Sequence, residues 1–136
     1  PTEPRVPVGT EFVNENGNIV NMAFGKFGGL ALINSKEGSI RSNHYHKTDW
    51  HFITVMSGVV HYYWRPAGSS EEPQMEIFRM GETFFTPPMV EHGIYSPRET
   101  DIMALSRISR RHADHEADVV RIKLISLDGE RIVTHR

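Results

Sequence analysis

The sequence predicts an all-β domain whose antiparallel strands close into a barrel or pack as a sandwich. Short β-like runs are separated by turn residues every eight to twelve positions, which is the spacing typical of such folds. Glycine and proline gather between the runs, where tight connections need their backbone conformations. Helical periodicity is nearly absent. Together these three observations favour an all-β class over a helical one.

Eight runs alternate apolar and polar side chains or are rich in β-branched and aromatic residues, as strands are. In chain order they cover residues 18–24, 30–34, 50–57, 59–65, 75–80, 83–86, 102–108 and 119–125. Only residues 110–118 offer a turn or two of helix. Because they lack an apolar stripe, we interpret them as a polar connection before the last strands.

Length and composition indicate one soluble globular domain. The 136 residues suffice for a single core, and 38% hydrophobic with 24% charged residues is ordinary for a globular protein. No apolar run approaches the roughly 20 residues of a membrane helix, and no secretion segment stands at the beginning, so we expect a cytoplasmic protein. The absence of cysteine excludes disulfides and thiolate catalysis. A net charge of −2 without a basic stripe argues against a nucleic-acid partner.

Histidine is the unusual residue, with eight in the chain. His44 and His46 are two apart, so on a strand both imidazoles lie on one face. His51 has the opposite parity and joins them only if the chain reverses at residues 47–49, while His92 arrives from a separate strand. Several imidazoles suit zinc, iron, copper or nickel better than magnesium or calcium. The alternative is a solvated or hydrogen-bonded pair of histidines without metal.

Two segments resemble the motifs of the cupin superfamily. Residues 38–58 match the first motif in every spacing, from Gly38 through the His-x-His pair to Gly58, with His51 in the slot of the motif's glutamate. Residues 81–96 resemble the second motif through Gly81, Pro87 and His92. They depart from it at Met89, where the motif has glycine, and at Ser96, where it has asparagine.

The resemblance implies a single-domain cupin over residues 1–136, a double-stranded β-helix or jelly-roll barrel with its barrel roughly at 18–126. By position it also implies four metal ligands, namely His44, His46, His51 and His92. Asp49 is a rival to His51 as a ligand, or a group that supports a ligand through a hydrogen bond, because it shares the parity of His51. One divalent transition metal ion is expected, and zinc, iron, nickel and manganese all stay open. A shell without a carboxylate leaves the ion its full charge, which strengthens it as a Lewis acid.

Candidate substrate-binding residues come from two other segments. Arg41, three residues before His44, is similar to the arginine in cupin domains of nucleotide-sugar enzymes, and its guanidinium suits a phosphate or carboxylate. The alternative is a surface arginine paired with Glu37 or Asp49. His61 and Tyr63 share one face of the aromatic run 59–65, which either walls a ligand pocket or packs as core and dimer contact. No catalytic residue can be named from the sequence. His112 and His115 are weaker candidates for a second metal site.

The function hypotheses fall into two classes. The leading one is a metal-dependent enzyme acting on an anionic or carbonyl-bearing small molecule, either an isomerase or epimerase of sugars or nucleotide sugars, or an Fe(II) dioxygenase. The other is a cupin that binds a small ligand without catalysis, since a cupin fold alone does not fix the activity. By analogy with small cupins we expect a homodimer and no nucleic-acid or membrane partner.

Overall fold

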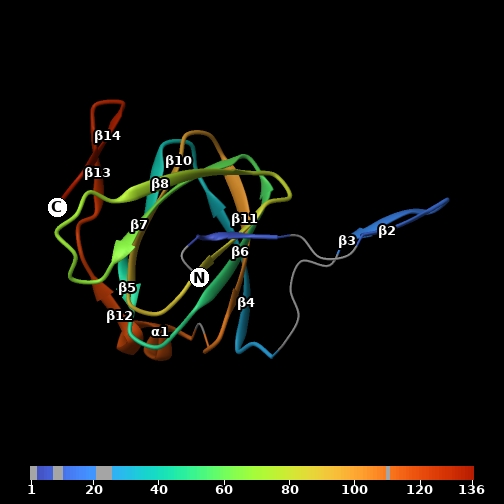
Figure 1. The fold of residues 1–136 in the computed structure, drawn as a ribbon, viewed down its shortest axis with the longest axis horizontal. Coiled ribbons are helices and arrows are strands. Elements are labelled where there is room, and N and C mark those ends of the chain that lie inside the picture. Colours follow the sequence, from blue (N-terminus) through green and yellow to red (C-terminus); the bar gives the residue numbers. More distant parts are fainter. Residues whose placement is uncertain (1–2, 8–10, 21–25, 110) are drawn as a thin grey trace.

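A computed structural model describes residues 3–7, 11–20, 26–109 and 111–136 of the chain. Two five-stranded antiparallel sheets face each other and enclose the core (Figure 1). One has the strand order β1-β9-β6-β11-β4 and the other the order β12-β5-β10-β7-β8. Their strands are β1 (Arg5–Val6), β4 (Gly29–Ser35), β5 (Ser39–His46), β6 (His51–Ser57), β7 (Val59–Pro66), β8 (Gln74–Arg79), β9 (Thr83–Thr86), β10 (Val90–Ser96), β11 (Thr100–Ser106) and β12 (Val119–Arg121).

Successive strands cross from one sheet to the other along most of the chain. Strands β4, β6, β9 and β11 belong to one sheet, and β5, β7, β10 and β12 belong to the other. This alternation is the jelly-roll arrangement, and it confirms the predicted all-β class. Strands far apart in sequence consequently become neighbours: β10 lies between β5 and β7.

Smaller elements complete the chain. Strands β2 (Glu11–Asn14) and β3 (Gly17–Val20) form a hairpin that lies apart from the barrel in Figure 1. Strands β13 (Ile125–Asp128) and β14 (Arg131–Thr134) form a second hairpin. The segment expected to be a polar connection contains a helix, α1 (His112–Asp118). Part of the run predicted at 18–24 lies outside the described residues, as does Arg110. Among the described residues, no helix has the length and apolar character needed to cross a membrane.

The core lies between the sheets and is aliphatic and aromatic. Alternation along β6 places His51, Ile53 and Val55 inside, as the sequence pattern predicts. From β7, Val60 and Tyr62 are buried in the core and Trp64 packs against it. The remaining buried members are Phe78, Phe84, Ile94, Ile102 and Ala104.

Met89 is one of the two positions at which the chain departs from the second cupin motif. It stands where the motif has glycine, and its backbone φ is 61°, in the left-handed region that glycine adopts most easily. Its amide donates to the carbonyl of His46 at 2.8 Å, and its own carbonyl accepts from the amide of Ala67 at 2.9 Å. The turn before β10 therefore keeps its shape with a methionine, held by hydrogen bonds to the neighbouring segments.

Candidate metal centre and cavity

Strand pairing brings the histidines of the two motifs together. β10 lies antiparallel beside β5, and His92 stands directly opposite His44 in the register. His44 and His46 are both buried because they share the inner face of β5. Ser42 and Asn43 precede them with positive φ, and the register of the pair shifts between His92 and Gly93. This bulge ends the regular pairing next to the histidines.

Four imidazoles therefore lie close together inside the barrel. The ring of His44 is 4.7 Å from that of His46 and 4.8 Å from that of His92, centre to centre. The ring of His51 is 4.5 Å from that of His46. Their exposed fractions are only 8% for His44, 1% for His46, 5% for His51 and 2% for His92. Four sequence-predicted metal ligands thus meet in one buried cluster.

The donor atoms fit a metal ion. One nitrogen from each of His44, His46 and His92 lies within 4.8 Å of the others. Among the described residues, Nδ1 of His44 and both ring nitrogens of His46 are buried without a hydrogen-bond partner. His92 donates Nδ1–H to the carbonyl of Val90 at 3.0 Å, which leaves Nε2 with a lone pair. Nδ1 of His46 lies 3.5 Å from Oδ2 of Asp118, whereas burial of His44 Nδ1 and His46 Nε2 is costly unless something binds them. The cluster can hold a metal ion.

Burial keeps these imidazoles uncharged. Together with a smaller contribution from the neighbouring His92 and His46, it lowers the pKa of His44 to about 2. It lowers the pKa of His46 to about 4, with a smaller contribution from His51. It also lowers the pKa of His92 to about 3, against the opposing hydrogen bond to Val90. Neutral imidazole is the form that binds metal, so at pH 7 no proton competes for these three rings.

The pH dependence of stability follows from these values. In the unfolded chain each histidine takes up a proton near pH 6.5, whereas in the folded protein His44, His46 and His92 take it up only near pH 2–4. Between those limits the unfolded state binds more protons than the folded state. The free energy of unfolding is therefore highest above pH 6.5 and decreases as the pH falls below it. Each such histidine contributes up to about 1.4 kcal/mol per pH unit.

We expect urea unfolding of the metal-free protein to give a lower free energy of unfolding at pH 5 than at pH 7. The matched control is His112→Gln on the exposed end of α1, which should leave the slope unchanged. A free energy of unfolding that stays flat between pH 7 and pH 5 would contradict the buried, uncharged state of the cluster.

The loop between β5 and β6 is held by two buried carboxylates. Oδ1 of Asp118 accepts from the amide and the hydroxyl of Thr48 at 2.9 and 2.8 Å, and its Oδ2 accepts from the amide of Asp49 at 3.0 Å. Oδ1 of Asp49 in turn accepts from the amides of Trp50, Arg107 and Ile108. These bonds fix the chain reversal that points His51 toward His44 and His46.

Asp49 also fixes the ring of His51. Nε2 of His51 lies 2.9 Å from Oδ2 of Asp49, so the imidazole donates there and its Nδ1 keeps the lone pair. Burial would raise the pKa of the Asp49 carboxyl, but the hydrogen bond from His51 and the backbone bond from Ile108 bring it below its ordinary value. Burial would likewise raise the pKa of the Asp118 carboxyl, but hydrogen bonds from Thr48 and Asp49 bring it below its ordinary value. Both carboxylates are therefore charged at neutral pH.

A cavity of about 170 Å³ opens beside the cluster. Its apolar wall comes from the inner faces of both sheets, and its polar lining includes Arg41, His44 and His51. The Arg41 guanidinium donates to the hydroxyl of Ser35 at 2.8 Å and to the carbonyl of Asn34 at 2.6 Å. Within the described part of the chain it forms no ion pair, so neither Glu37 nor Asp49 neutralises it. Arg41 thus brings an uncompensated positive charge to the cavity.

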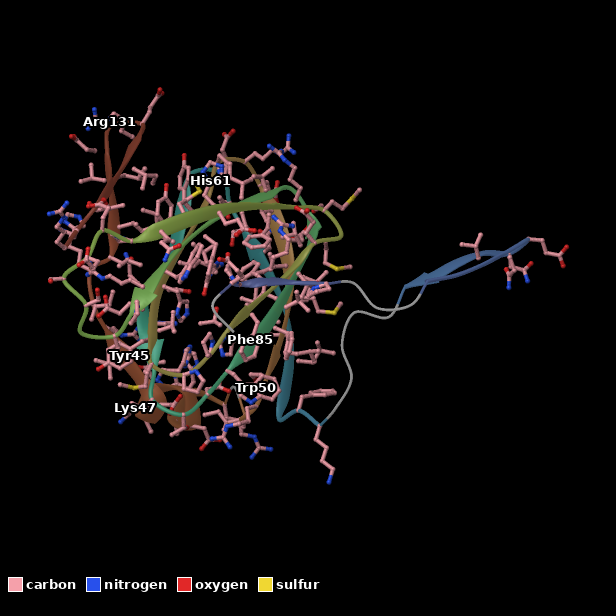
Figure 2. All side chains as sticks on the ribbon, viewed as in Figure 1. Tyr45, Lys47, Trp50, His61, Phe85 and Arg131 are labelled. Atoms are coloured by element: carbon pink, nitrogen blue, oxygen red, sulfur yellow. The ribbon has the colours of Figure 1, made fainter. Side chains whose placement is uncertain are left out.

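The other two predicted substrate-binding residues lie elsewhere. His61 and Tyr63 lie on the face of β7 opposite Tyr62 and Trp64, which are in the core. The ring of His61 packs against that of Tyr95 at 5.7 Å, and neither His61 nor Tyr63 lines the cavity. In Figure 2, His61 lies toward the opposite end of the barrel from Tyr45 and Lys47, which flank His46 in sequence.

His115 lies at the site, although the sequence offers only a weak indication of it. His115, on α1, lines the cavity, and its ring lies 5.6 Å from that of His46 and 6.1 Å from that of His44. The only sequence signal that could have found it is its spacing of three from Asp118, which puts both on one face of a helix. The role of Asp118 cannot be predicted from the sequence, because a single acidic residue in a polar stretch has no distinguishing pattern.

Comparison with known proteins supports the fold. No family model matches the chain, and no curated protein does. Among solved structures, a sugar 3,4-ketoisomerase of Thermoanaerobacterium thermosaccharolyticum in complex with TDP has a TM-score of 0.68 at 12% identity, covering 86% of this chain and 88% of that one. The TDP-fucose 3,4-ketoisomerase of Campylobacter jejuni has a TM-score of 0.67 at 10% identity, covering 84% and 87%.

A third similar structure is the dTDP-4-dehydrorhamnose 3,5-epimerase of Sulfolobus tokodaii, with a TM-score of 0.61 at 14% identity over 76% of this chain and 69% of that one. At these identities the likeness establishes the fold, a cupin-type jelly roll. It is also in line with the resemblance to cupin domains of nucleotide-sugar isomerases that the sequence suggests.

Proposed function

We propose that this protein is a metal-dependent isomerase or epimerase of a small, negatively charged substrate that carries a carbonyl group, of the sugar or nucleotide-sugar class. The observation that carries the proposal is one cavity lined by Arg41, His44 and His51, the last of which is hydrogen-bonded to Asp49. An anion-binding group, a metal-competent cluster and a candidate base are thus within reach of one small molecule. The activities of the similar solved structures support the same class.

The size of the cavity narrows the substrate. About 170 Å³ is below the roughly 300–1,000 Å³ of pockets that enclose drug-sized ligands. A free sugar or a short keto acid fits inside whole, whereas a nucleotide sugar would place only its reacting ring there. Arg41 is exposed at the edge of the cavity, where its fork of donors suits a phosphate or carboxylate outside the enclosed part.

The ion would be held by His44, His46 and His92, the three histidines whose nitrogens lie together. When bound, a divalent ion polarises a carbonyl oxygen and so acidifies the neighbouring C–H bond. Zinc, iron, nickel and manganese all stay candidates. Asp49 stays a rival ligand, because one of its oxygens lies within 4.8 Å of nitrogens of His46 and His51, although the carboxylate already accepts from four donors. His51 keeps Nδ1 free of that network.

His51 is the proposed base. Its Nδ1 carries the lone pair because Nε2–H donates to Asp49, and the charge of Asp49 stabilises the imidazolium that forms when Nδ1 accepts a proton. Isomerisation between neighbouring carbons requires removal of a proton next to a carbonyl and its return to another carbon or another face. One positioned base can perform both transfers.

A second candidate function is an Fe(II) dioxygenase, which one observation favours. The central cluster of His44, His46 and His92 contains no carboxylate, so the ion would keep its charge. The two functions differ in their demand for oxygen and in the metals they accept. A dioxygenase consumes oxygen and works with iron, whereas an isomerase works under nitrogen and tolerates zinc.

The test loads metal-free protein with each of the four ions and incubates it anaerobically in D₂O. The substrates are a TDP-4-keto-6-deoxy sugar, the free keto sugar and a short keto acid. Proton NMR follows deuterium entering next to the carbonyl, which we expect for at least one substrate, with His51→Gln lowering the rate by about 10²–10⁴-fold. Oxygen uptake by the iron-loaded protein in a parallel aerobic incubation, with no exchange under nitrogen, would favour the dioxygenase. Tight binding without either reaction would leave a ligand-binding cupin.

A homodimer also stays a prediction, and the outer face of one sheet supports it. The edge strand β4 exposes Leu30 and Leu32, at 56% and 71%, and Met103 stands directly opposite Leu32 on β11. An edge strand with exposed leucines invites pairing with another chain. This face, rather than the aromatic strand β7, offers the exposed apolar surface for a second copy.

A further inference from the structure

The sheet β1-β9-β6-β11-β4 carries a row of apolar side chains on the outside of the barrel. Leu105 of β11 stands between Leu30 of β4 and Phe52 of β6, and Phe52 stands opposite Phe85 of β9. Residues directly opposite one another in antiparallel strands project from the same face of a sheet. Ile53, which follows Phe52, is buried in the core, so the row projects away from the core.

Neighbouring side chains widen this row. Met103 and Leu32 stand opposite each other two residues away on β11 and β4, and they are 36% and 71% exposed. The ring of Trp50 lies 5.6 Å from that of Phe52 and 6.2 Å from that of Phe85, and Figure 2 shows Trp50 and Phe85 near each other. We refer to the row together with Met103, Leu32 and Trp50 as the outer face.

A polar rim bounds the outer face at one end. The Asn34 side chain donates to the carboxylate of Asp101 at 2.8 Å, and the hydroxyl of Ser57 donates to the same carboxylate at 3.2 Å. These three residues lie toward the ends of β4, β11 and β6, beyond Leu32 and Met103. The residues of the outer face itself carry no charge. An uncharged apolar centre with a polar rim is the composition of a protein–protein interface.

The β2–β3 hairpin is a small sheet of its own. Among the described strands, β2 and β3 pair only with each other, and Figure 1 shows their hairpin apart from the barrel. The register places the apolar residues Phe12 and Ile19 opposite each other, and Val13 is 73% exposed. An isolated two-stranded hairpin is marginally stable at best in water. The hairpin therefore needs a further apolar surface to pack on.

The chain attaches this hairpin to the sheet that carries the outer face. β1 precedes the hairpin and β4 follows it, and these are the two edge strands of that sheet. In a single copy the hairpin extends away from the barrel, so that Val13 of the hairpin and Leu32 of the outer face both stay exposed. A contact that covers both surfaces is therefore a contact between copies.

We propose that two copies of this chain exchange their β2–β3 hairpins, each hairpin covering the outer face of the other copy. The inference rests on the proposed homodimer and adds the segment that makes the contact. Exchange of an identical element between protomers is a low-cost route to a dimer, and a two-fold axis makes the two contacts identical. Each contact consequently counts twice toward the roughly 1,200–2,000 Å² that a stable interface buries.

Sedimentation equilibrium measures the dimer dissociation constant of the parent and three variants. Phe12→Asp places a charge in the hairpin and Leu32→Asp places one in the outer face. Met80→Asp is the matched control, because Met80 is also 71% exposed but follows β8 of the other sheet. We expect Phe12→Asp and Leu32→Asp each to raise the dissociation constant at least about tenfold and Met80→Asp to leave it unchanged. Circular dichroism should show that all three variants are folded.

Cross-linking distinguishes exchange from a contact within one copy. The chain contains no cysteine, so single thiols can be introduced without background. A tagged Val13→Cys protein is mixed with an untagged Leu32→Cys protein, left to exchange subunits and treated with a short bis-maleimide. We expect a product that contains one chain of each kind. The control mixture replaces Leu32→Cys by Met80→Cys and should give little of that product.

Three results would overturn the exchange. A parent that stays monomeric at every concentration would refute the proposed homodimer as well. A dimer whose dissociation constant is unchanged in Phe12→Asp would show that the outer faces associate without the hairpins. In a double variant with Val13→Cys and Leu32→Cys, a cross-link confined to single chains would place the hairpin on its own sheet. Metal binding and deuterium exchange are measured separately, so the proposed activity is tested independently of this result.

Discussion

Replacing His92 by alanine is expected to remove metal binding while the barrel stays folded. His92 stands opposite His44 in the register, is 2% exposed, and has Nε2 available because Nδ1–H donates to Val90. Without it the cluster of three nitrogens that already lie together is reduced to two from one strand. We expect the affinity for zinc to fall more than about a hundredfold, since even residues that only support a ligand are worth 10–100-fold.

Folding should survive this change because the folded protein no longer has to bury an uncharged imidazole. The control is His61→Ala on β7, where a partly buried histidine packs against Tyr95 away from the cavity. Metal content by elemental analysis and affinity by chelator competition should match the parent in the control. A His92→Ala protein that is folded and retains parental affinity would contradict the assignment of this ligand.

The second large effect is expected at Asp49. Its carboxylate is 1% exposed and accepts hydrogen bonds from the amides of Trp50, Arg107 and Ile108 and from the ring of His51. In Asp49→Ala these donors lose their acceptor inside the protein, and each one left unpaired costs about 1–3 kcal/mol. We expect a loss of about 3–5 kcal/mol in the free energy of unfolding, as when one partner of a buried pair is removed.

Urea unfolding measures this loss. The control is Asp128→Ala, an exposed aspartate in β13, whose replacement should change stability by no more than about 0.5 kcal/mol. Asp49→Asn keeps one acceptor oxygen, so its free energy of unfolding should lie between those of Asp49→Ala and Asp128→Ala. If Asp49→Ala were as stable as the control, the carboxylate would not hold the loop between β5 and β6, and the orientation of His51 would need another cause.

The fold could be predicted because its determinants are local and periodic. Alternation along residues 50–57 fixed the inner face of β6, and glycine or proline marked the breaks between strands. Strand β5 is not among the predicted runs, and neither is β10, although His92 is expected to arrive from a separate strand. The residues of β10 mix charged, aromatic and glycine positions, because this strand runs through the centre of a sheet beside the histidine cluster, where buried polar groups interrupt the apolar pattern.

The candidate site was predictable in part. The parity of His44 and His46 and the reversal before His51 gave three members of the cluster, and the second motif gave His92. Whether His51 binds a metal stays a prediction, since its hydrogen bond to Asp49 depends on contacts that spacing does not encode. His61 and Tyr63 do not line the cavity. The sequence could not exclude them, because both faces of β7 carry aromatic residues and periodicity does not show which face points inward.

His115 shows where sequence reasoning ends. Its approach to His46 depends on Asp118 accepting hydrogen bonds from a loop about 70 residues earlier in the chain. No periodicity marks such a contact, because a polar helix anchored by one carboxylate has no apolar stripe. The sequence indicates His115 only as a weak candidate for a second metal site, and its place beside the cluster follows from the three-dimensional contacts.

The most direct test is a titration of the metal-free parent with zinc, nickel, manganese and anaerobic Fe(II), followed by isothermal calorimetry and elemental analysis after dialysis. The convergence of imidazoles from β5 and β10 predicts one tightly held ion per chain for at least one of these metals. If a correctly folded parent retained none of these metals after dialysis, the buried histidine cluster would not be a metal site, and the account would be contradicted.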